Sequence, residues 1–262
     1  MADATSPTAA RESFLHLWTS RLRSFLFWDP LVWFYTVVLG ALSLLSSFFD
    51  RDGGIQHGFA RFWARIILAT LGARVNVEGL NALDTTKACV YVVNHLSALD
   101  TPILYHCLPF QFRILAKKEL FSYPFMGWHL RRSGQIPVDQ QNVRSSVRSI
   151  GQAVKSLQSG MPIVIFPEGG RSQDGRLQPF MSGAFYLAIK AQVEVVPMAI
   201  LGTYEMLPIN SFHIRPRPLH LRFGKPISAA GMSTRDTDAL TQSAYEAISD
   251  LCGREPAAKQ AV

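Results

Sequence analysis

Short apolar runs alternate with amphipathic stretches through most of the chain, and this alternation constrains the fold more than any other feature. The runs of strand length are 75–77, 89–93, 113–116, 135–138, 162–166, 193–200 and 219–223. Apolar residues at helical spacing predict helices at 60–72, 101–108, 143–158, 183–192 and 236–252. Alternating strands and helices are typical of α/β domains, in which helices cover a sheet. We therefore expect one α/β domain over residues 59–252, followed by a flexible tail at 253–262.

The amino-terminal segment contains an uncharged run of nineteen residues, from Leu31 to Phe49. A bilayer crossing needs about 20 apolar residues, so this run is long enough to span or to enter a membrane deeply. Before it, Arg21 and Arg23 are mixed with aromatic and aliphatic residues, as in an interfacial helix, and the Asp29-Pro30 pair predicts a break between the two pieces. We expect residues 1–58 to associate with a membrane; a buried core helix is the alternative.

The orientation of this segment does not follow from its flanking charges. Three arginines precede the run and three follow it, so the excess of positive charge that marks cytoplasmic loops is missing. The same flanks would suit a spanning helix or a re-entrant hairpin.

Composition narrows the possible partners. Of the 262 residues, 48% are hydrophobic and only 17% charged, while the net charge of +7 favours anionic partners. Because the basic residues are spread out and form no nucleic-acid-binding motif, we expect no nucleic-acid partner. The three cysteines lack the spacing of a zinc site or a disulfide framework, and the seven histidines are scattered, so we expect no metal.

The stretch "NHLSALD", residues 94–100, follows one of the predicted strands and contains His95 and Asp100. Five helical steps turn about 500°, so on one helix these side chains would point about 140° apart. They can cooperate only if the chain bends between them, with His95 ending the strand and Asp100 entering the next helix. The alternative is a helix cap, in which Ser97 and Asp100 form a capping box and His95 has no role.

The stretch "FPEGGRS", residues 166–172, ends a second predicted strand. Gly169 and Gly170 allow backbone N–H groups to approach a ligand, and Arg171 can bind a phosphate through two parallel hydrogen bonds. An ordinary tight turn with a solvated arginine is the alternative. The nucleotide P-loop pattern and the GxSxG pattern of serine hydrolases are both absent from the sequence.

Together, these stretches resemble the motifs of the glycerolipid acyltransferases, most closely the 1-acyl-sn-glycerol-3-phosphate acyltransferases. "NHLSALD" resembles their Asn-His-x4-Asp motif, and "FPEGGRS" resembles Phe-Pro-Glu-Gly-Thr-Arg. "FRILAKKELF" (112–121) and "VVPMAI" (195–200) also resemble segments of that family, and the resemblance covers about residues 62–227. It implies a single acyltransferase domain with a central mixed β-sheet flanked by helices, preceded by a membrane-associated helical segment.

The resemblance also implies a reaction and a site. His95 would take the proton of the acceptor hydroxyl as that hydroxyl attacks an acyl thioester, and Asp100 would orient the imidazole. The residues expected to bind the acceptor are Lys117, Glu168, Gly169, Gly170 and Arg171. Lys118 is expected to face solvent or lipid headgroups.

The expected product is phosphatidic acid, made from 1-acyl-sn-glycerol 3-phosphate without a cofactor. Acyl-CoA or acyl carrier protein would supply the thioester, and the domain would lie on the cytoplasmic face of the inner membrane. Two departures leave the acceptor open: Gly170 replaces the usual threonine, and Gln140 replaces an arginine thought to hold the acceptor's phosphate. Glycerol 3-phosphate, another lysophospholipid or a lyso-aminolipid could be the acceptor, and a thioester hydrolase or a non-catalytic lipid-binding homologue are further alternatives.

Overall fold

The computed structural model describes residues 18–50, 52–139 and 143–253. The strands are β1 (Val75–Glu78), β2 (Val90–Val93), β3 (Arg113–Lys117), β4 (Ile136–Val138), β5 (Ile163–Ile165), β6 (Val195–Leu201) and β7 (Leu219–Phe223). The longer helices are α2 (Asp29–Ser46), α3 (Gly54–Thr70), α4 (Asp100–Cys107), α5 (Met126–Arg132), α6 (Val143–Gln158), α7 (Gly183–Ala191) and α9 (Thr237–Gly253). Short helical turns are η1 (Ser24–Trp28), η2 (Leu80–Ala82), η3 (Lys118–Ser122), α8 (Thr203–Met206) and η4 (Thr234–Asp236). The predicted α/β class is confirmed.

The seven strands form one mixed sheet in the order β1-β7-β6-β2-β5-β3-β4. Only the β6–β7 pair is antiparallel; every other neighbouring pair is parallel. Strands β6, β2, β5, β3 and β4 therefore all end at the same edge of the sheet. In open α/β sheets this carboxyl edge is where ligands bind.

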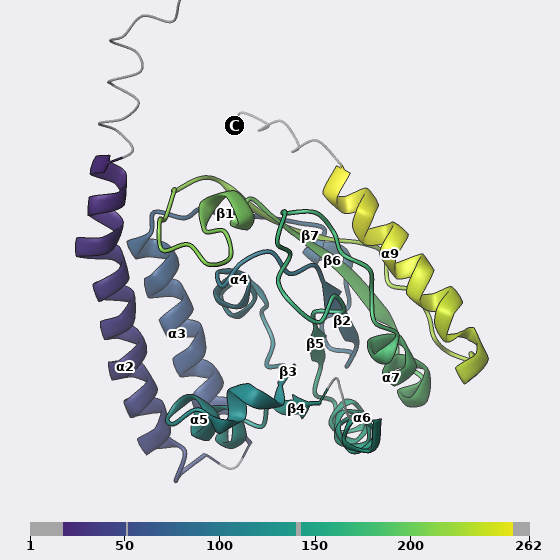
Figure 1. Ribbon diagram of the computed structural model, residues 1–262. Coiled ribbons are helices and arrows are strands. Elements are labelled where there is room, and N and C mark those ends of the chain that lie inside the picture. The colour runs from purple at the N-terminus through teal and green to yellow at the C-terminus, as the bar shows by residue number, and fades with distance from the viewer. Residues whose placement is uncertain (1–17, 51, 140–142, 254–262) are drawn as a thin grey trace, which may run out of the picture.

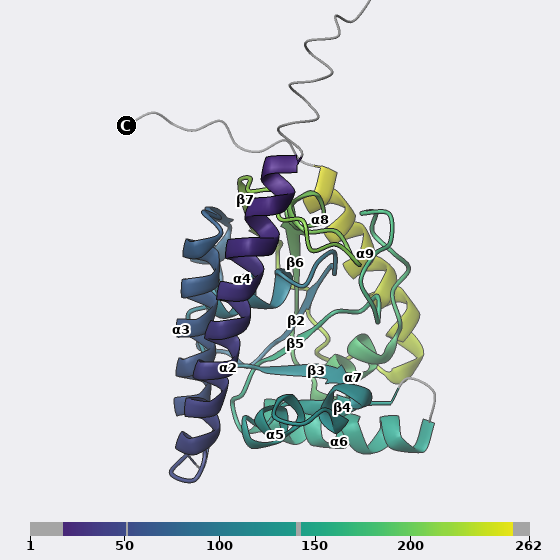
Figure 2. The ribbon, with the colours of Figure 1, turned by 60° about the vertical axis from the view of Figure 1, so that its left-hand side comes forward.

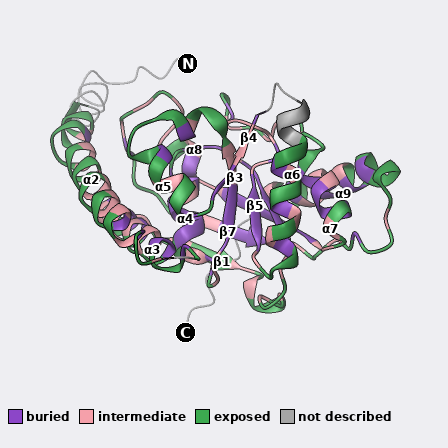
Figure 3. Cartoon of the chain, turned by 90° about the horizontal axis from the view of Figure 1, so that it is seen from below, coloured by how far each residue is buried: buried purple, intermediate pink, exposed green. Residues whose placement is uncertain are grey.

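Helices cover both faces of the sheet, and the burial pattern shows why (Figure 1). In β2, Tyr91 and Val93 pack with the buried face of α3 and α4, whereas Val90 and Val92 pack with α6, α7 and α9. Successive side chains of a strand point to opposite faces, so an all-apolar strand such as β2 must be covered on both sides. When the chain is coloured by burial, the buried strands are seen between two layers of helices (Figure 3).

The amino-terminal helix is continuous from Trp18 to Ser46, so the predicted break at Asp29-Pro30 is wrong. The π-helical turn η1 comes directly before α2, and Pro30 lies in the first turn of α2. A proline there lacks an N–H and its ring crowds the carbonyl one turn earlier, and the wider π turn relieves that conflict without ending the helix.

This helix lies along α3, outside the sheet layers (Figures 1 and 2). By length and composition it could cross a membrane, and no residue of its most apolar stretch is buried. Trp33, Phe34 and Val37 are each at least 60% exposed. On its inner side, Thr36 Oγ1 accepts a hydrogen bond from Trp63 Nε1 of α3 at 2.9 Å. The helix thus packs on the domain with one face and leaves a large apolar face uncovered.

Candidate active site

His95 and Asp100 lie side by side at the carboxyl edge of the sheet. His95 follows the end of β2, Asp100 begins α4, and the chain bends between them, as the motif spacing predicted. His95 Nδ1 lies 2.8 Å from Asp100 Oδ2. The Asp100 side chain is fully buried, whereas 19% of the His95 side chain is exposed. The Asp100 carboxylate is therefore shielded from solvent, whereas a ligand can reach the His95 imidazole.

The Asp100 carboxylate also fixes the turn between the two residues. Its Oδ2 accepts hydrogen bonds from the backbone N–H groups of Leu96 and Ser97, at 2.7 and 2.8 Å. Because Oδ2 is an acceptor to these donors, the imidazole bond is assigned with Nδ1–H donating, which leaves Nε2 as a base. One side chain thus holds the turn before α4 and orients the imidazole, while α4 itself begins without a side-chain cap.

Phe166, at the end of β5, packs on the imidazole. The two rings are stacked with centroids 4.0 Å apart and planes inclined by 22°. This contact restricts rotation of the His95 ring away from Asp100. Sequence reasoning missed Phe166, although it begins the FPEGG stretch.

Asn94 and Glu168 tie the strand ends to one another. The Asn94 side chain accepts from the backbone N–H of Ile200 in β6 and donates to its carbonyl, at 2.7 and 2.9 Å. Glu168 Oε1 accepts from the backbone N–H of His95 at 2.7 Å, and Oε2 accepts from that of Gln178 at 2.9 Å. Both oxygens of the Glu168 carboxylate therefore hold the backbone of the site.

Burial raises the pKa of Glu168 to about 7. The two backbone N–H donors favour its ionised form, and the loss of water around the carboxylate outweighs them. The carboxyl group that holds the His95 backbone thus titrates near neutral pH.

Lys117 and Gly170 are brought together from different strands. Lys117 ends β3, and a Cβ added at Gly170 would lie 3.7 Å from its Nζ. Gly169 has a φ of 72°, a conformation that glycine adopts without strain, and it turns the chain directly after Glu168. Arg171 is exposed beside them and forms no ion pair within the described residues. Two cations and a glycine turn therefore flank the His95 site.

Lys118 is exposed, as expected, and its ammonium group also forms an ion pair. Its Nζ lies 2.5 Å from Asp139 Oδ2, and Asp139 is buried just past the end of β4. The ion pair links the carboxyl ends of β3 and β4. Gln140, the next residue and the departure from the family pattern, lies outside the described residues.

Comparisons with known proteins agree with this arrangement. The sequence profile of the family described as Acyltransferase matches residues 74–201. A chloroplastic 1-acyl-sn-glycerol-3-phosphate acyltransferase from Brassica napus is 36% identical over 165 residues, 62% of this chain and 47% of the relative. A 1-acyl-sn-glycerol-3-phosphate acyltransferase from Helicobacter pylori is 33% identical over 190 residues, 71% of this chain and 78% of the relative.

A solved structure is also similar. The crystal structure of the 1-acyl-sn-glycerophosphate acyltransferase PlsC from Thermotoga maritima superimposes with a TM-score of 0.72 at 25% identity, covering 90% of this chain and 98% of that one. The chain spans about half the length of the plant relatives that it matches.

The fold and the histidine–aspartate site define an α/β acyltransferase domain. The chain belongs to the acyltransferase family that includes the 1-acyl-sn-glycerol-3-phosphate acyltransferases.

Proposed function

We propose that this protein transfers a fatty acyl group from a thioester to the free hydroxyl of 1-acyl-sn-glycerol 3-phosphate, giving phosphatidic acid. The observation that carries the proposal is the His95–Asp100 pair, 2.8 Å apart, at the carboxyl edge of the sheet. The names of the similar proteins from Brassica napus, Helicobacter pylori and Thermotoga maritima support the choice of acceptor.

In the proposed reaction, His95 Nε2 accepts the proton of the acceptor hydroxyl while its oxygen attacks the thioester carbonyl. Asp100 stabilises the imidazolium that forms. The tetrahedral intermediate then collapses, the carbon–sulfur bond breaks, and the imidazolium returns its proton to the leaving thiolate. The products are an ester and a free thiol, and no covalent acyl-enzyme intermediate or cofactor is needed.

The acceptor's phosphate would bind near Lys117 and Arg171. Both are exposed cations next to the glycine turn, and both lie at the strand ends that flank His95. Charge-assisted hydrogen bonds contribute roughly 1.5–3 kcal/mol each, enough to select a phosphorylated acceptor. Glu168 would support this site through the backbone of His95.

The uncovered apolar face of the amino-terminal helix supports membrane association. The proposed place of the domain is the cytoplasmic face of the inner membrane. A lysophospholipid acceptor and a diacyl product both reside in the bilayer, so a moored enzyme meets them without extracting them into water. The donor would be acyl-CoA or an acylated carrier protein.

A test of the proposed function is thioester consumption by the full chain in detergent with a panel of acceptors. The panel contains 1-acyl-sn-glycerol 3-phosphate, glycerol 3-phosphate, lysophosphatidylcholine and a lyso-aminolipid, and products are identified by mass spectrometry. We expect phosphatidic acid as the dominant product. Faster acylation of another acceptor would replace the proposed one, and thiol release without any acylated product would indicate a hydrolase.

A further inference from the structure

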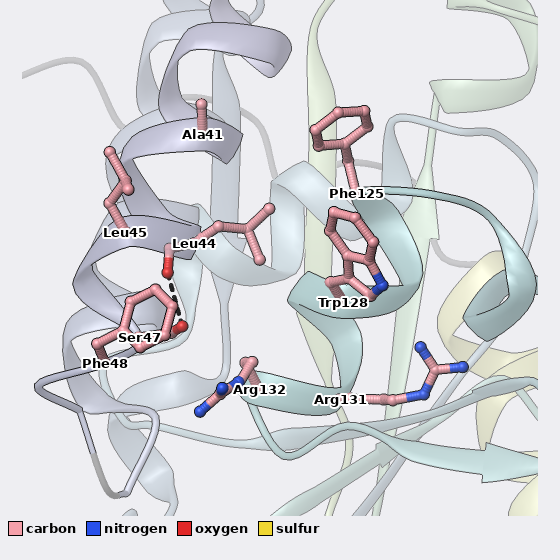
Figure 4. Close-up of a pocket in the computed structure, with 9 residues that line it drawn as sticks. All are labelled: Ala41, Leu44, Leu45, Ser47, Phe48, Phe125, Trp128, Arg131 and Arg132. Carbon is pink, nitrogen blue, oxygen red and sulfur yellow. Dashed lines mark hydrogen bonds between the residues drawn. The ribbon is translucent and has the colours of Figure 1, made fainter.

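A pocket of about 530 Å³ lies between the amino-terminal helix and α5. Figure 4 shows its lining residues, which come from the end of α2 and from the α5 region: Ala41, Leu44, Leu45, Ser47, Phe48, Phe125, Trp128, Arg131 and Arg132. Aliphatic and aromatic side chains form most of its wall, and two arginines lie at one end. We call it the α2–α5 groove.

The two helices that form the groove are joined by a specific contact. Ser43 Oγ of α2 lies 3.2 Å from His129 Nδ1 of α5, and Ser43 is only 1% exposed. Burial lowers the pKa of His129, which favours the neutral imidazole at this contact. The contact between Ser43 and His129 thus fixes the two helices that form the groove.

The charge at its end is unbalanced. Arg131 and Arg132 are exposed in the last turn of α5, and within the described residues neither forms an ion pair with a carboxylate. The Arg132 guanidinium carbon lies 5.3 Å from the centroid of the Phe48 ring, which holds that side chain across the groove. An anionic group with an apolar tail would complement both parts of the surface.

The arginines of the groove lie at the opposite edge of the sheet from His95. Helix α5 lies in the connection that returns the chain from the carboxyl end of β3 to the amino end of β4. A Cβ added at Gly134, two residues after Arg132, would lie 2.8 Å from Nε of Arg113, the first residue of β3. Lys117 at the other end of β3 lies beside Gly170. The catalytic residues and the groove's arginines therefore occupy opposite ends of β3.

We propose that the α2–α5 groove binds an intact anionic phospholipid of the bilayer, with an acyl chain along the apolar wall and the phosphate at Arg131 and Arg132. The surroundings fit a bilayer lipid: Tyr123, Met126 and Trp128, in or just before α5, are each more than 50% exposed. Exposed aromatic side chains are typical of the headgroup boundary of a bilayer, and clustered arginines attract anionic lipids. The bound lipid is distinct from acceptor and donor, so the inference requires membrane association but not acyl transfer.

The test measures lipid binding directly, with the full chain in detergent. Phosphatidylglycerol or phosphatidylcholine is titrated in, and retained lipid is counted by mass spectrometry under non-denaturing conditions. Arg131→Gln combined with Arg132→Gln should weaken retention of phosphatidylglycerol about tenfold or more. Arg148→Gln combined with Lys155→Gln removes the same charge from the exposed face of α6 and should leave retention unchanged.

A second pair of variants tests the groove itself. Ala41→Trp places a large side chain in the groove, whereas Leu42→Trp places one on a neighbouring exposed face of α2. We expect loss of phosphatidylglycerol only in Ala41→Trp, with turnover of short-chain soluble substrates unchanged in both. Equal retention of the two lipids, or retention by Ala41→Trp, would overturn the proposal. A raised KM for the thioester in Ala41→Trp would also overturn it, because the groove would then hold the donor's acyl chain.

Discussion

The backbone N–H of His95 donates a 2.7 Å hydrogen bond to Glu168 Oε1, so the end of β2 is held by a carboxylate that follows β5. This bond links the motif at residues 94–100 to the motif at residues 166–172. Moving Glu168 would move His95 relative to Phe166, the ring on which the imidazole is stacked. We therefore assign Glu168 as a positioning residue.

The titration of Glu168 predicts a pH-dependent stability. Burial raises its pKa to about 7, above the value of about 4.3 for an unfolded chain. The folded protein then binds more protons between these values, so this contribution to stability is fully present below about pH 4 and is lost as pH rises past about 7. Thermal unfolding of wild type and Glu168→Gln from about pH 4 to pH 8 should show a difference that shrinks as pH rises. A difference independent of pH would contradict the buried titration.

The orienting role of Asp100 predicts that Asp100→Asn lowers turnover by about 10²-fold or more, because the amide spoils the tautomer and leaves the imidazolium without its partner. Some stability should be lost as well, since Oδ2 also accepts two backbone N–H bonds. The measurement is kcat per folded molecule, with folding followed by circular dichroism. Asp250→Asn, at an exposed position of α9, is the control. If the folded fraction of Asp100→Asn turns over normally, the residue serves only to hold the turn before α4.

The phosphate site predicts a change in acceptor preference. Arg171→Ala and Lys117→Ala should each reduce kcat/KM for 1-acyl-sn-glycerol 3-phosphate by about ten- to a hundredfold relative to monoacylglycerol, which lacks the phosphate. Arg176→Ala, an exposed arginine of the same loop region, should leave the ratio unchanged. An unchanged ratio in both Arg171→Ala and Lys117→Ala would point to an acceptor without this phosphate.

The uncovered face of α2 predicts the site of membrane attachment. Replacing Trp33, Phe34 and Val37 by Gln removes apolar surface without touching the Thr36–Trp63 bond that holds the helix to α3. Flotation with vesicles should fall strongly for this variant, while activity on short-chain soluble acceptors is retained. Val147→Gln, a change at an exposed residue of α6, is the control. Full flotation of the triple variant would show that another surface attaches the protein.

Much of this molecule could be predicted from its sequence because local patterns determine it. Each predicted strand is present, since a short run such as 90–93, apolar on both faces, is typical of a strand covered on both sides. The bend between His95 and Asp100 followed from the spacing once the two residues were assumed to cooperate. Helix α5 was missed because its seven residues are too few to show a helical period.

Other features depend on contacts between distant segments. Glu168 resembled a ligand-binding residue, and only the juxtaposition of β2 and β5 reveals that it holds the His95 backbone. Asn94 reaches Ile200, more than a hundred residues later, through the same sheet. Pro30 predicted a helix end, but the wider π turn before it makes room for the proline ring, and the helix continues. No pattern within one segment carries this information.

The most direct test of the account is single-turnover acyl transfer by His95→Ala. Removing the general base should slow the chemical step by about 10²–10⁴-fold while the fold and acceptor binding are kept. His106→Ala, an exposed histidine in the last turn of α4, is the matched control and should react like wild type. A folded His95→Ala that transfers the acyl group at nearly the wild-type rate would contradict the assignment of His95 as the base.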